Sequence, residues 1–539
     1  MDEKTKPWFW GAVVYQIYPR SFYDSNGDGV GDLNGIIEKL DYLAGTDNSL
    51  GVNAIWLCPF YCSPMADFGY DVSDYQDVDP IFGTLDNFKE LVKQAHARDI
   101  KLIIDLVANH TSDEHPWFLE SKSSLKNSKR DWYIWRKPKD GQSPNDWLSV
   151  FGGSAWQLDP QTGEYYLHSF SVKQPDLNWD NPEVRWAIKS VMRFWLDLGV
   201  DGFRADAIYW LSKDHRFRND PINSHRVVGD SRDYDSLTHK YSRKGPHLYE
   251  YLHEIATVLK SYGQRFMVIE AVPEGGKEPT EYLKFYELVD EHHIAPFNFE
   301  GIYLSWKAPL LKSFINKFEA VLEPDYLPVY TLGNHDKPRL VSRVGLPSAR
   351  TAAMMLLTLP GMPFIYYGEE IGMTNVSIPP DKQMDPQRVE GVDRDKFRSP
   401  LQWNSQKNAG FSVKEPWLPV SPYYKDVNIQ TQLKDKMSLL NLYRQLIKLR
   451  SSSNILKLGI YEELSLHEKV YGFGRRLGDD RFIVILNISG SAVSLDLGAI
   501  EGKVILSSYQ DISNKIVAKR LNLRPHEGMI INSGRRLHS

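Results

Sequence analysis

The sequence predicts an α/β protein built on a closed (β/α)8 TIM barrel, and two observations support this fold class. Apolar runs typical of buried strands alternate with amphipathic helical stretches over most of the chain, which indicates repeated β-α units around a parallel sheet. Eight such runs occur, which favours a closed barrel over an open doubly wound sheet. A glycine-rich dinucleotide turn after the first run is absent. The expected strands lie near residues 13–18, 54–58, 101–107, 202–207, 266–271, 293–297, 329–332 and 363–367.

Two segments depart from this alternation. A polar, Trp-rich insertion follows the third expected strand and is too long for an ordinary connection. Near the C-terminus, short alternating runs follow one another without helices between them, which is typical of an antiparallel β-domain. We therefore expect a barrel domain in two parts, 1–109 and 175–454, an inserted small domain at 110–174 and a C-terminal antiparallel β-domain at 455–539.

Composition narrows the classes of partner. The formal net charge of −5 over 539 residues gives no electrostatic reason to expect a nucleic acid or an anionic membrane. The only two cysteines, Cys58 and Cys62, indicate reduced thiols and neither a disulfide framework nor a zinc site. The apolar stretch 351–368 is interrupted by Pro360 and Pro363, so it predicts a buried helix running into a strand. We expect a soluble, cytoplasmic protein that is a monomer or homodimer and acts on a small molecule.

Five short polar motifs end or follow the apolar runs. Their side chains include three candidate catalytic carboxylates, two histidines and an arginine, and in a barrel the chemistry lies at the C-terminal ends of the strands. Glycoside hydrolysis needs one carboxylate as nucleophile and one carboxylic acid as proton donor. The motifs are 67–70 (DFGY), 105–110 (DLVANH), 202–207 (GFRADA), 269–270 (IE) and 333–336 (GNHD).

The order of these motifs resembles that of the alpha-amylase superfamily of retaining glycoside hydrolases, along nearly the whole chain. Residues 174–179 (QPDLNW) are similar to a motif of the oligo-1,6-glucosidase and α-glucosidase branch. The resemblance implies that the insertion is a domain B that walls one side of a cleft. It also implies a C-terminal domain C.

The resemblance also assigns the catalytic groups. Asp206 would be the nucleophile, and Arg204 shares its face of the strand, where a guanidinium favours the ionised carboxylate. Glu270 would be the general acid/base, because the apolar run before it is a setting in which a carboxyl group keeps its proton more readily. Glu274, beyond Pro273 in a glycine-rich loop, is the competing candidate. Asp336 would be the third carboxylate, stabilising the transition state.

Further residues would bind the terminal glucose. Asp67 would bind its outer hydroxyl groups and pair across the sugar with Arg398, whose segment 397–403 (FRSPLQW) is similar to a family motif. Ala207 leaves room for an α-1,4-linked leaving sugar, whereas a Val after the nucleophile accompanies α-1,6 activity in the resembled group. The remaining expected contacts are stacking by Tyr70, hydrogen bonds from His110 and His335, and a wall contact by Phe151.

A separate acidic loop, 24–32 (DSNGDGVGD), predicts a structural cation site. Oxygen ligands at alternate positions, with glycines that permit a sharp turn, suit Ca²⁺, with Mg²⁺ as a substitute. Relatives in the resembled family carry a calcium loop here, although this one lacks the bidentate Glu of an EF-hand. The expected ligands are Asp24, Asn26, Asp28, the Val30 carbonyl and Asp32. A solvated turn is the alternative.

The sequence therefore predicts an exo-acting, retaining α-glucosidase that removes terminal α-1,4-linked glucose from short, maltose-type substrates, with some transglucosylation. The long excursion 208–250 would limit the room on the leaving-group side. The alternatives are an oligo-1,6-glucosidase, or an isomerase acting on sucrose or trehalose. A more remote alternative is a non-catalytic subunit of a transporter, which would carry a membrane anchor and lack catalytic carboxylates.

Overall fold

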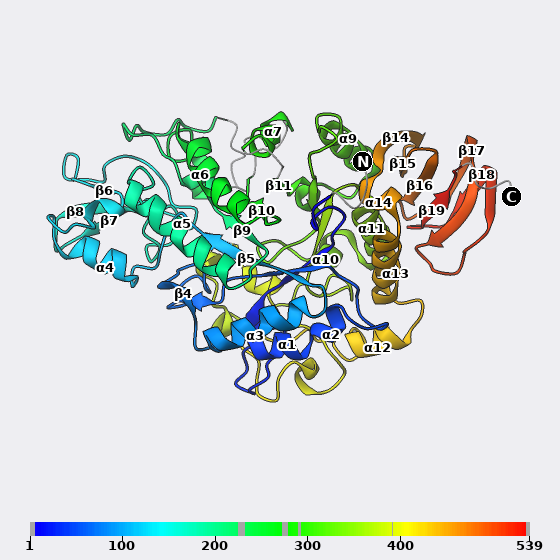
Figure 1. Cartoon of the computed structure of the whole chain (residues 1–539), viewed down its shortest axis with the longest axis horizontal. Helices are drawn as coiled ribbons and strands as arrows, with labels where there is room; N and C mark the ends of the chain where they lie inside the picture. Colours follow the sequence, from blue (N-terminus) through cyan, green and yellow to red (C-terminus); the bar gives the residue numbers. More distant parts are fainter. Residues whose placement is uncertain (1–5, 225–231, 272–278, 289–292, 391, 535–539) are drawn as a thin grey trace.

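Eight parallel strands close into a barrel at the centre of the molecule (Figure 1). The structure, a computed structural model, describes residues 6–224, 232–271, 279–288, 293–390 and 392–534. Around the barrel the strand order is β1-β13-β12-β11-β10-β9-β5-β2, which confirms the predicted fold class. The strands are β1 (Val14–Ile17), β2 (Ala54–Leu57), β5 (Lys101–Val107), β9 (Gly202–Asp206), β10 (Phe266–Ile269), β11 (Ile294–Asn298), β12 (Val329–Thr331) and β13 (Met362–Tyr366).

The barrel strands are apolar runs because both of their faces are covered. Every residue of β9 and β10 is buried, which is typical of a parallel sheet enclosed by helices. The two strands approach closely at Gly202, where an added Cβ atom would lie 2.3 Å from the Phe266 carbonyl oxygen. In this register Arg204 is opposite Asp105 on β5 and Val268 on β10. The close contact therefore fixes which side chains meet at the end of β9.

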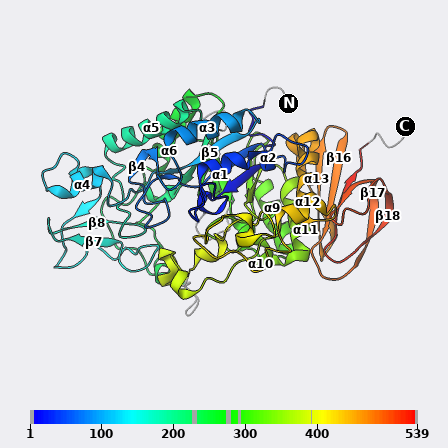
Figure 2. The ribbon, with the colours of Figure 1, turned by 90° about the horizontal axis from the view of Figure 1, so that it is seen from below.

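Helices lie around the barrel (Figure 2). In α5 (Pro182–Asp197), which Asn181 caps, the buried Val184, Ile188, Val191 and Trp195 recur at helical spacing. The other helices of the described barrel region are α1 (Leu33–Glu38), α2 (Leu40–Leu43), α3 (Leu85–His96), α6 (Leu248–Ser261), α7 (Thr280–Tyr286), α8 (Glu300–Tyr303), α9 (Ala308–Glu319), α10 (Leu340–Val344), α11 (Leu346–Thr358), α12 (Ile429–Lys434), α13 (Leu439–Ser452) and α14 (Asn454–Leu458).

The insertion after β5 forms its own small unit at one end of the molecule (Figure 1). It holds α4 (Pro116–Ser123) and a three-stranded sheet of β6 (Trp135–Arg136), β8 (Glu164–Leu167) and β7 (Trp156–Asp159). Trp147, Trp156 and Leu167 belong to its separate apolar cluster. A second small sheet, of β3 (Tyr61–Cys62) and β4 (Asp74–Val78), follows β2.

The C-terminal region is a six-stranded antiparallel sheet at the opposite end of the molecule (Figures 1 and 2). Its order is β14-β15-β16-β19-β17-β18, and side chains including Ile483, Val504 and Ile531 form its own core. The strands are β14 (Ile460–His467), β15 (Val470–Leu477), β16 (Asp480–Asn487), β17 (Val493–Ser507), β18 (Ile516–Leu523) and β19 (Gly528–Asn532).

The apolar stretch near residue 360 is not a membrane span. As predicted, it forms α11 followed by β13, and both are buried. In the part of the chain that the structure describes, every helix is too short or too polar to cross a membrane. Cys58 and Cys62 are free thiols, as predicted. The cytoplasmic location and the oligomeric state stay predictions.

Candidate active site

A cavity of about 330 Å³ lies at the C-terminal ends of the barrel strands. Asp206 is the last residue of β9, Glu270 follows β10, and Asp336 lies beyond the end of β12. The structure therefore brings the three predicted catalytic carboxylates to one cavity. Its lining comprises Asp67, Tyr70, His110, Val150, Phe151, Phe170, Gln174, Asp206, Ala207, Trp210, Arg232, Glu270, Tyr303, Asp336, Lys337, Gln387, Val392 and Arg394.

The guanidinium of Arg204 holds three carboxylates together beneath the cavity. One terminal nitrogen lies 2.6 Å from Asp206 Oδ1 and 2.7 Å from Asp105 Oδ1. The other lies 2.7 Å from Glu270 Oε2. Arg204 is buried, so these charge-assisted hydrogen bonds are shielded from water. Asp206 and Glu270 are consequently fixed as neighbours by a single rigid group.

Burial, together with the crowding of acidic groups, controls the protonation of this cluster. Burial raises the pKa of Asp206 well above its usual range; Arg204 lowers it, and the carboxylates of Glu270 and Asp105 raise it again. Burial also raises the pKa of Asp105, to about 6. Neighbouring carboxyl groups titrate as a unit, so the cluster retains a proton to higher pH than isolated carboxylates would. A retaining glycosidase needs one proton on its pair of carboxyl groups.

An unusual backbone conformation adds a contact to Glu270. Ala207 adopts the left-handed region, with φ of +48°, directly after Asp206. Its N–H group lies 3.3 Å from Glu270 Oε2 and donates to it. A non-glycine residue in this region is strained, and such strain concentrates at functional sites. The turn thus orients the two carboxylates relative to each other.

Two arginines donate hydrogen bonds to the Asp336 carboxylate. A terminal nitrogen of Arg398 lies 2.8 Å from Asp336 Oδ1, and one of Arg394 lies 3.3 Å from the same oxygen. Burial would raise the pKa of Asp336, but the permanently charged guanidinium groups of Arg394 and Arg398 contribute to holding the pKa below its usual range. Asp336 is therefore a permanently charged group, unlike Asp206.

Asp67 is paired directly with an arginine that the sequence analysis did not name. A terminal nitrogen of Arg394 lies 2.6 Å from Asp67 Oδ1, and the same guanidinium binds Asp385 at 2.7 Å. The direct partner of Asp67 is therefore Arg394, and a pairing of Arg398 with Asp67 across a bound sugar stays a prediction. Arg398 is held elsewhere because its Nε donates to the His335 carbonyl oxygen at 2.9 Å, which aims its fork at Asp336.

The two predicted histidines are buried and neutral. Burial lowers the pKa of His110 to about 4 and that of His335 to about 3. His335 lies between Gln16 and Tyr70, each 2.8 Å from a ring nitrogen, and its ring stacks parallel to Tyr70. Both rings therefore keep one N–H group at neutral pH; His110 lines the cavity, whereas Nε2 of His335 lies against Tyr70 and 3.2 Å from Asp336 Oδ2.

Several wall residues were missed by the sequence analysis. Arg394 gave no signal beyond its place four residues before Arg398 in a charged segment. Phe151, which was predicted, lines the cavity, and the Arg394 guanidinium lies 5.4 Å from its ring centroid. Trp210, near the start of the predicted excursion 208–250, also lines the cavity and was not predicted. The competing candidate Glu274 lies outside the described residues.

The acidic loop 24–32 is bound mainly to itself. Its side chains accept hydrogen bonds from main-chain N–H groups: Asp24 from Gly27 and Gly29, Asn26 from Asp28, Asp28 from Val30, and Asp32 from Ser25 and Gly35. Among the residues that the structure describes, no group of three or more His, Cys, Asp or Glu side chains is placed to hold a metal ion. The calcium site stays a prediction.

Comparisons with known proteins agree with the fold and with the kind of site described above. Residues 16–459 match the alpha-amylase catalytic domain family. The chain is 41% identical to the oligo-1,6-glucosidase of Parageobacillus thermoglucosidasius, over 97% of this chain and 98% of that protein. It is 37% identical to maltase 1 of Drosophila virilis, over 97% and 86%. The structure of the α-glucosyl transfer enzyme XgtA superposes with a TM-score of 0.91 at 36% identity, over 98% of this chain and 100% of that one.

A closed parallel barrel with paired carboxylates at its C-terminal face is compatible with the class of enzymes that cleave glycosidic bonds. Within that class, the chain belongs to the alpha-amylase family. It is a glycoside hydrolase, and its relatives support hydrolysis of α-glucosides.

Proposed function

We propose that the protein is an exo-acting, retaining α-glucosidase of short α-glucosides. The observation that carries this proposal is the placement of Asp206 and Glu270 on the two terminal nitrogens of the Arg204 guanidinium, in one cavity. In retaining enzymes the two carboxyl groups are about 5–5.5 Å apart, and a larger gap of about 6.5–9.5 Å belongs to inverting enzymes. A shared guanidinium favours the shorter separation.

In the proposed mechanism Asp206 forms a bond to the anomeric carbon while the bond to the leaving oxygen breaks. Glu270 gives its proton to that oxygen, so the leaving sugar departs as an alcohol. Glu270, now ionised, then takes a proton from water, whose oxygen attacks the anomeric carbon and releases Asp206. Asp336 does not bond to the sugar. Its negative charge stabilises the positive charge that develops on the sugar ring in the transition state.

The proposal includes a closed end for a single terminal glucose. Asp67 and Asp336 are both bound to Arg394, so their oxygens lie on the same wall as acceptors for sugar hydroxyl groups. His110, His335 and Tyr70 lie near this wall. Moving Arg394 away from this wall would leave buried carboxylates without a partner, which is costly, so the wall is held in one arrangement; this supports removal of terminal residues over cleavage inside a long chain.

The proposed linkage preference is α-1,4, on the strength of Ala207. Its small side chain lines the cavity beside Asp206 and leaves room for the leaving sugar. The name of the Drosophila relative, a maltase, agrees with this preference, whereas the name of the Parageobacillus relative favours α-1,6 linkages. Transfer to a sugar acceptor is the further alternative, which the name of the XgtA structure supports.

A substrate panel tests the activity and the linkage together. We expect the highest kcat/KM on maltose, lower values on maltotriose and isomaltose, and very little glucose from starch. Trapping with a fluorinated α-glucosyl fluoride, followed by peptide mass spectrometry, should label Asp206. A label on another residue would refute the mechanism, and a preference for isomaltose would refute only the linkage.

A further inference from the structure

A buried lysine lies behind the cavity, and the mechanism above does not use it. Lys213 Nζ is 2.7 Å from Asp176 Oδ2 and donates to Asn109 Oδ1 at 3.1 Å. Both partners are fully buried, and burial lowers the pKa of Lys213. A buried ammonium group is costly unless it is paired, so its position calls for a specific role.

Lys213 determines which way the Asn109 amide points. An ammonium group can only donate, so the amide atom that faces Lys213 must be the oxygen. The amide nitrogen of Asn109 then faces two acceptors, Asp176 Oδ1 and His110 Nδ1, each at 3.2 Å. An ionised carboxylate can only accept, which independently gives the same orientation.

The orientation of Asn109 in turn selects the tautomer of His110. Burial keeps the ring neutral, so one nitrogen carries hydrogen and the other accepts. If Asn109 donates to Nδ1, the hydrogen must be on Nε2. His110 lines the catalytic cavity, and its Nε2 lies 3.2 Å from the side-chain nitrogen of Gln174.

Gln174 does not reverse this assignment. Its carbonyl oxygen accepts from the Ser171 N–H at 3.0 Å, and its nitrogen donates to Asp67 Oδ2 at 3.2 Å. The neutral ring can accept from only one of the two amides. Each amide nitrogen has a carboxylate as a further acceptor, but only the Asn109 amide is also held at its oxygen by a charged group, Lys213.

We propose that Lys213 is a positioning residue, which acts through Asp176 and Asn109 to keep His110 as an Nε2–H donor toward the terminal sugar. The inference rests on the proposed role of His110 at that sugar. Without Lys213 the Asn109 oxygen loses its donor and only Asp176 still orients the amide, so a fraction of the amides turn and present their oxygen to Nδ1. The ring hydrogen would then move to Nδ1, and the cavity would lose a donor.

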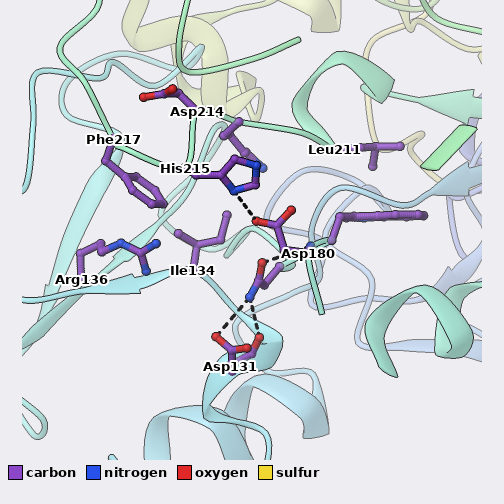
Figure 3. A pocket seen from close by; sticks show the side chains of 11 residues that line it. Asp131, Ile134, Arg136, Asp180, Leu211, Asp214, His215 and Phe217 are labelled. Carbon is purple, nitrogen blue, oxygen red and sulfur yellow. Dashed lines mark hydrogen bonds and ion pairs between the residues drawn. The ribbon is translucent and has the colours of Figure 1, made fainter. Parts of the chain in front are cut away.

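A second pocket, next to Lys213, allows a direct test of this proposal. Lys213 also lines a second pocket of about 250 Å³, whose wall includes Asp131, Asp180 and Asp214 (Figure 3). Asp180 points toward His215 and pairs with it at 3.0 Å. The acidic side chains favour entry of a small cation, so this pocket can deliver an alkylammonium ion to the space left by Lys213→Ala.

The experiment measures kcat/KM on p-nitrophenyl α-glucoside for Lys213→Ala, His110→Ala and the double variant. Loss of one hydrogen bond predicts about a tenfold fall for Lys213→Ala. If Lys213 acts through His110, the double variant should be no worse than His110→Ala, because effects within one network are not additive. Ethylammonium should restore Lys213→Ala, and tetramethylammonium, which cannot donate, should not. The ion-paired Lys189→Ala on α5 is the matched control and should keep its activity.

Lys213→Ala leaves Asp176 as an unpaired buried charge and could prevent folding. The variant Lys213→Met combined with Asp176→Asn removes both charges and should show the same fall. If Lys213→Ala keeps full activity while His110→Ala is impaired, Lys213 does not act through His110. The same conclusion follows if the two losses multiply in the double variant. Full activity of His110→Ala would instead refute the role of His110 in the proposed function.

Discussion

Two groups of acidic side chains, both predicted from sequence motifs, are held in different ways. At the cavity, Asp67, Asp206 and Asp336 are each paired with an arginine. In the loop 24–32, the acidic side chains accept from main-chain N–H groups. Asp67 and Arg394 are 327 residues apart in the chain, whereas Asp32 binds residues only seven and three positions away.

The difference indicates what each group does. A buried carboxylate that must stay charged needs an opposite charge, and a rigid arginine fork also fixes its direction. A carboxylate that closes a turn needs only the local N–H groups, which stabilise the turn and carry no net charge. Between these two groups, we infer that pairing with a buried arginine, close in sequence for Asp206 and distant for Asp67 and Asp336, marks the acidic residues that serve the reaction. The predictions that follow test this distinction.

Removal of either reacting carboxylate should have the largest effect. Asp206→Ala and Glu270→Ala should each lower kcat by at least ~10⁴-fold with the fold intact, because each deletes a bond-making or proton-transfer step. Circular dichroism would check the fold. Asp28→Ala, in the loop, is the matched control and should retain nearly full activity at room temperature. A merely tenfold loss for Asp206→Asn would contradict the assignment.

Arg394 should matter for both stability and binding. It is buried and bound to Asp67, Asp336 and Asp385, so Arg394→Met leaves buried carboxylates without a partner. Breaking a buried pair in this way costs about 3–5 kcal/mol of unfolding free energy. We expect a lower Tm together with a large rise in KM for maltose.

The neighbouring Arg388 provides the control for that variant. It is exposed and donates to a main-chain oxygen, at Gln383, instead of a carboxylate. Arg388→Met should change Tm and KM very little. Equal effects of the two substitutions would show that the arginines of this segment contribute general stability and no specific contact with the sugar-binding wall.

The pH dependence should reveal the coupling of Asp206 to Glu270. The Glu270 carboxylate is one of the groups that raise the pKa of Asp206, after burial. In Glu270→Gln that contribution is absent, so Asp206 stays ionised to lower pH. On an aryl glucoside with a good leaving group, the acid limb of kcat/KM should therefore move to lower pH. An unchanged acid limb would show that another group controls it.

Ala207 donates its main-chain N–H group to Glu270, one of the two reacting carboxylates. Its φ of +48° suits glycine and disfavours a β-branched residue. Ala207→Val should therefore destabilise the protein by about 1–3 kcal/mol from backbone strain, in addition to crowding the leaving sugar. Ala207→Gly should be tolerated in Tm and should keep the preference for maltose over isomaltose.

The ratio of maltose to isomaltose cleavage separates the two effects of Ala207→Val. Strain alone lowers both rates together, because it displaces the N–H group from Glu270. Crowding lowers maltose cleavage selectively. A constant ratio would remove Ala207 as the basis for the proposed α-1,4 preference.

The barrel and its reacting groups could be predicted because their signals are local. Each barrel strand is a short apolar run, and Asp206, Glu270 and Asp336 lie at or just beyond the end of such a run. Once eight runs close into a barrel, their C-terminal ends must meet at one face. Motif and topology together therefore locate the carboxylates without knowledge of any distance.

The partners of those groups could not be predicted for the same reason. The contact between Arg394 and Asp67 depends on how an irregular segment folds across the barrel, and no local pattern indicates it. The left-handed turn at Ala207 could not be predicted from the sequence either, because alanine has no preference for that conformation. The role inferred for Lys213 emerges only from the hydrogen-bonding capacity of atoms that the fold brings together.

The smallest expected effect concerns the loop 24–32, whose predicted Ca²⁺ site would be structural. Three carboxylates in nine residues repel one another, and a bound cation would relieve that repulsion, so Ca²⁺ should raise the Tm of the wild-type protein by a few degrees without changing its activity. Asp24→Ala should lower Tm even in chelator, since it removes contacts to two main-chain N–H groups. Asp28→Asn keeps an oxygen for the Val30 N–H and removes only charge. It should therefore abolish the response to Ca²⁺ while leaving Tm in chelator unchanged. If Ca²⁺ does not alter the wild-type Tm, the loop is a turn held by its own N–H groups, and the contrast with the arginine-paired carboxylates of the cavity becomes complete.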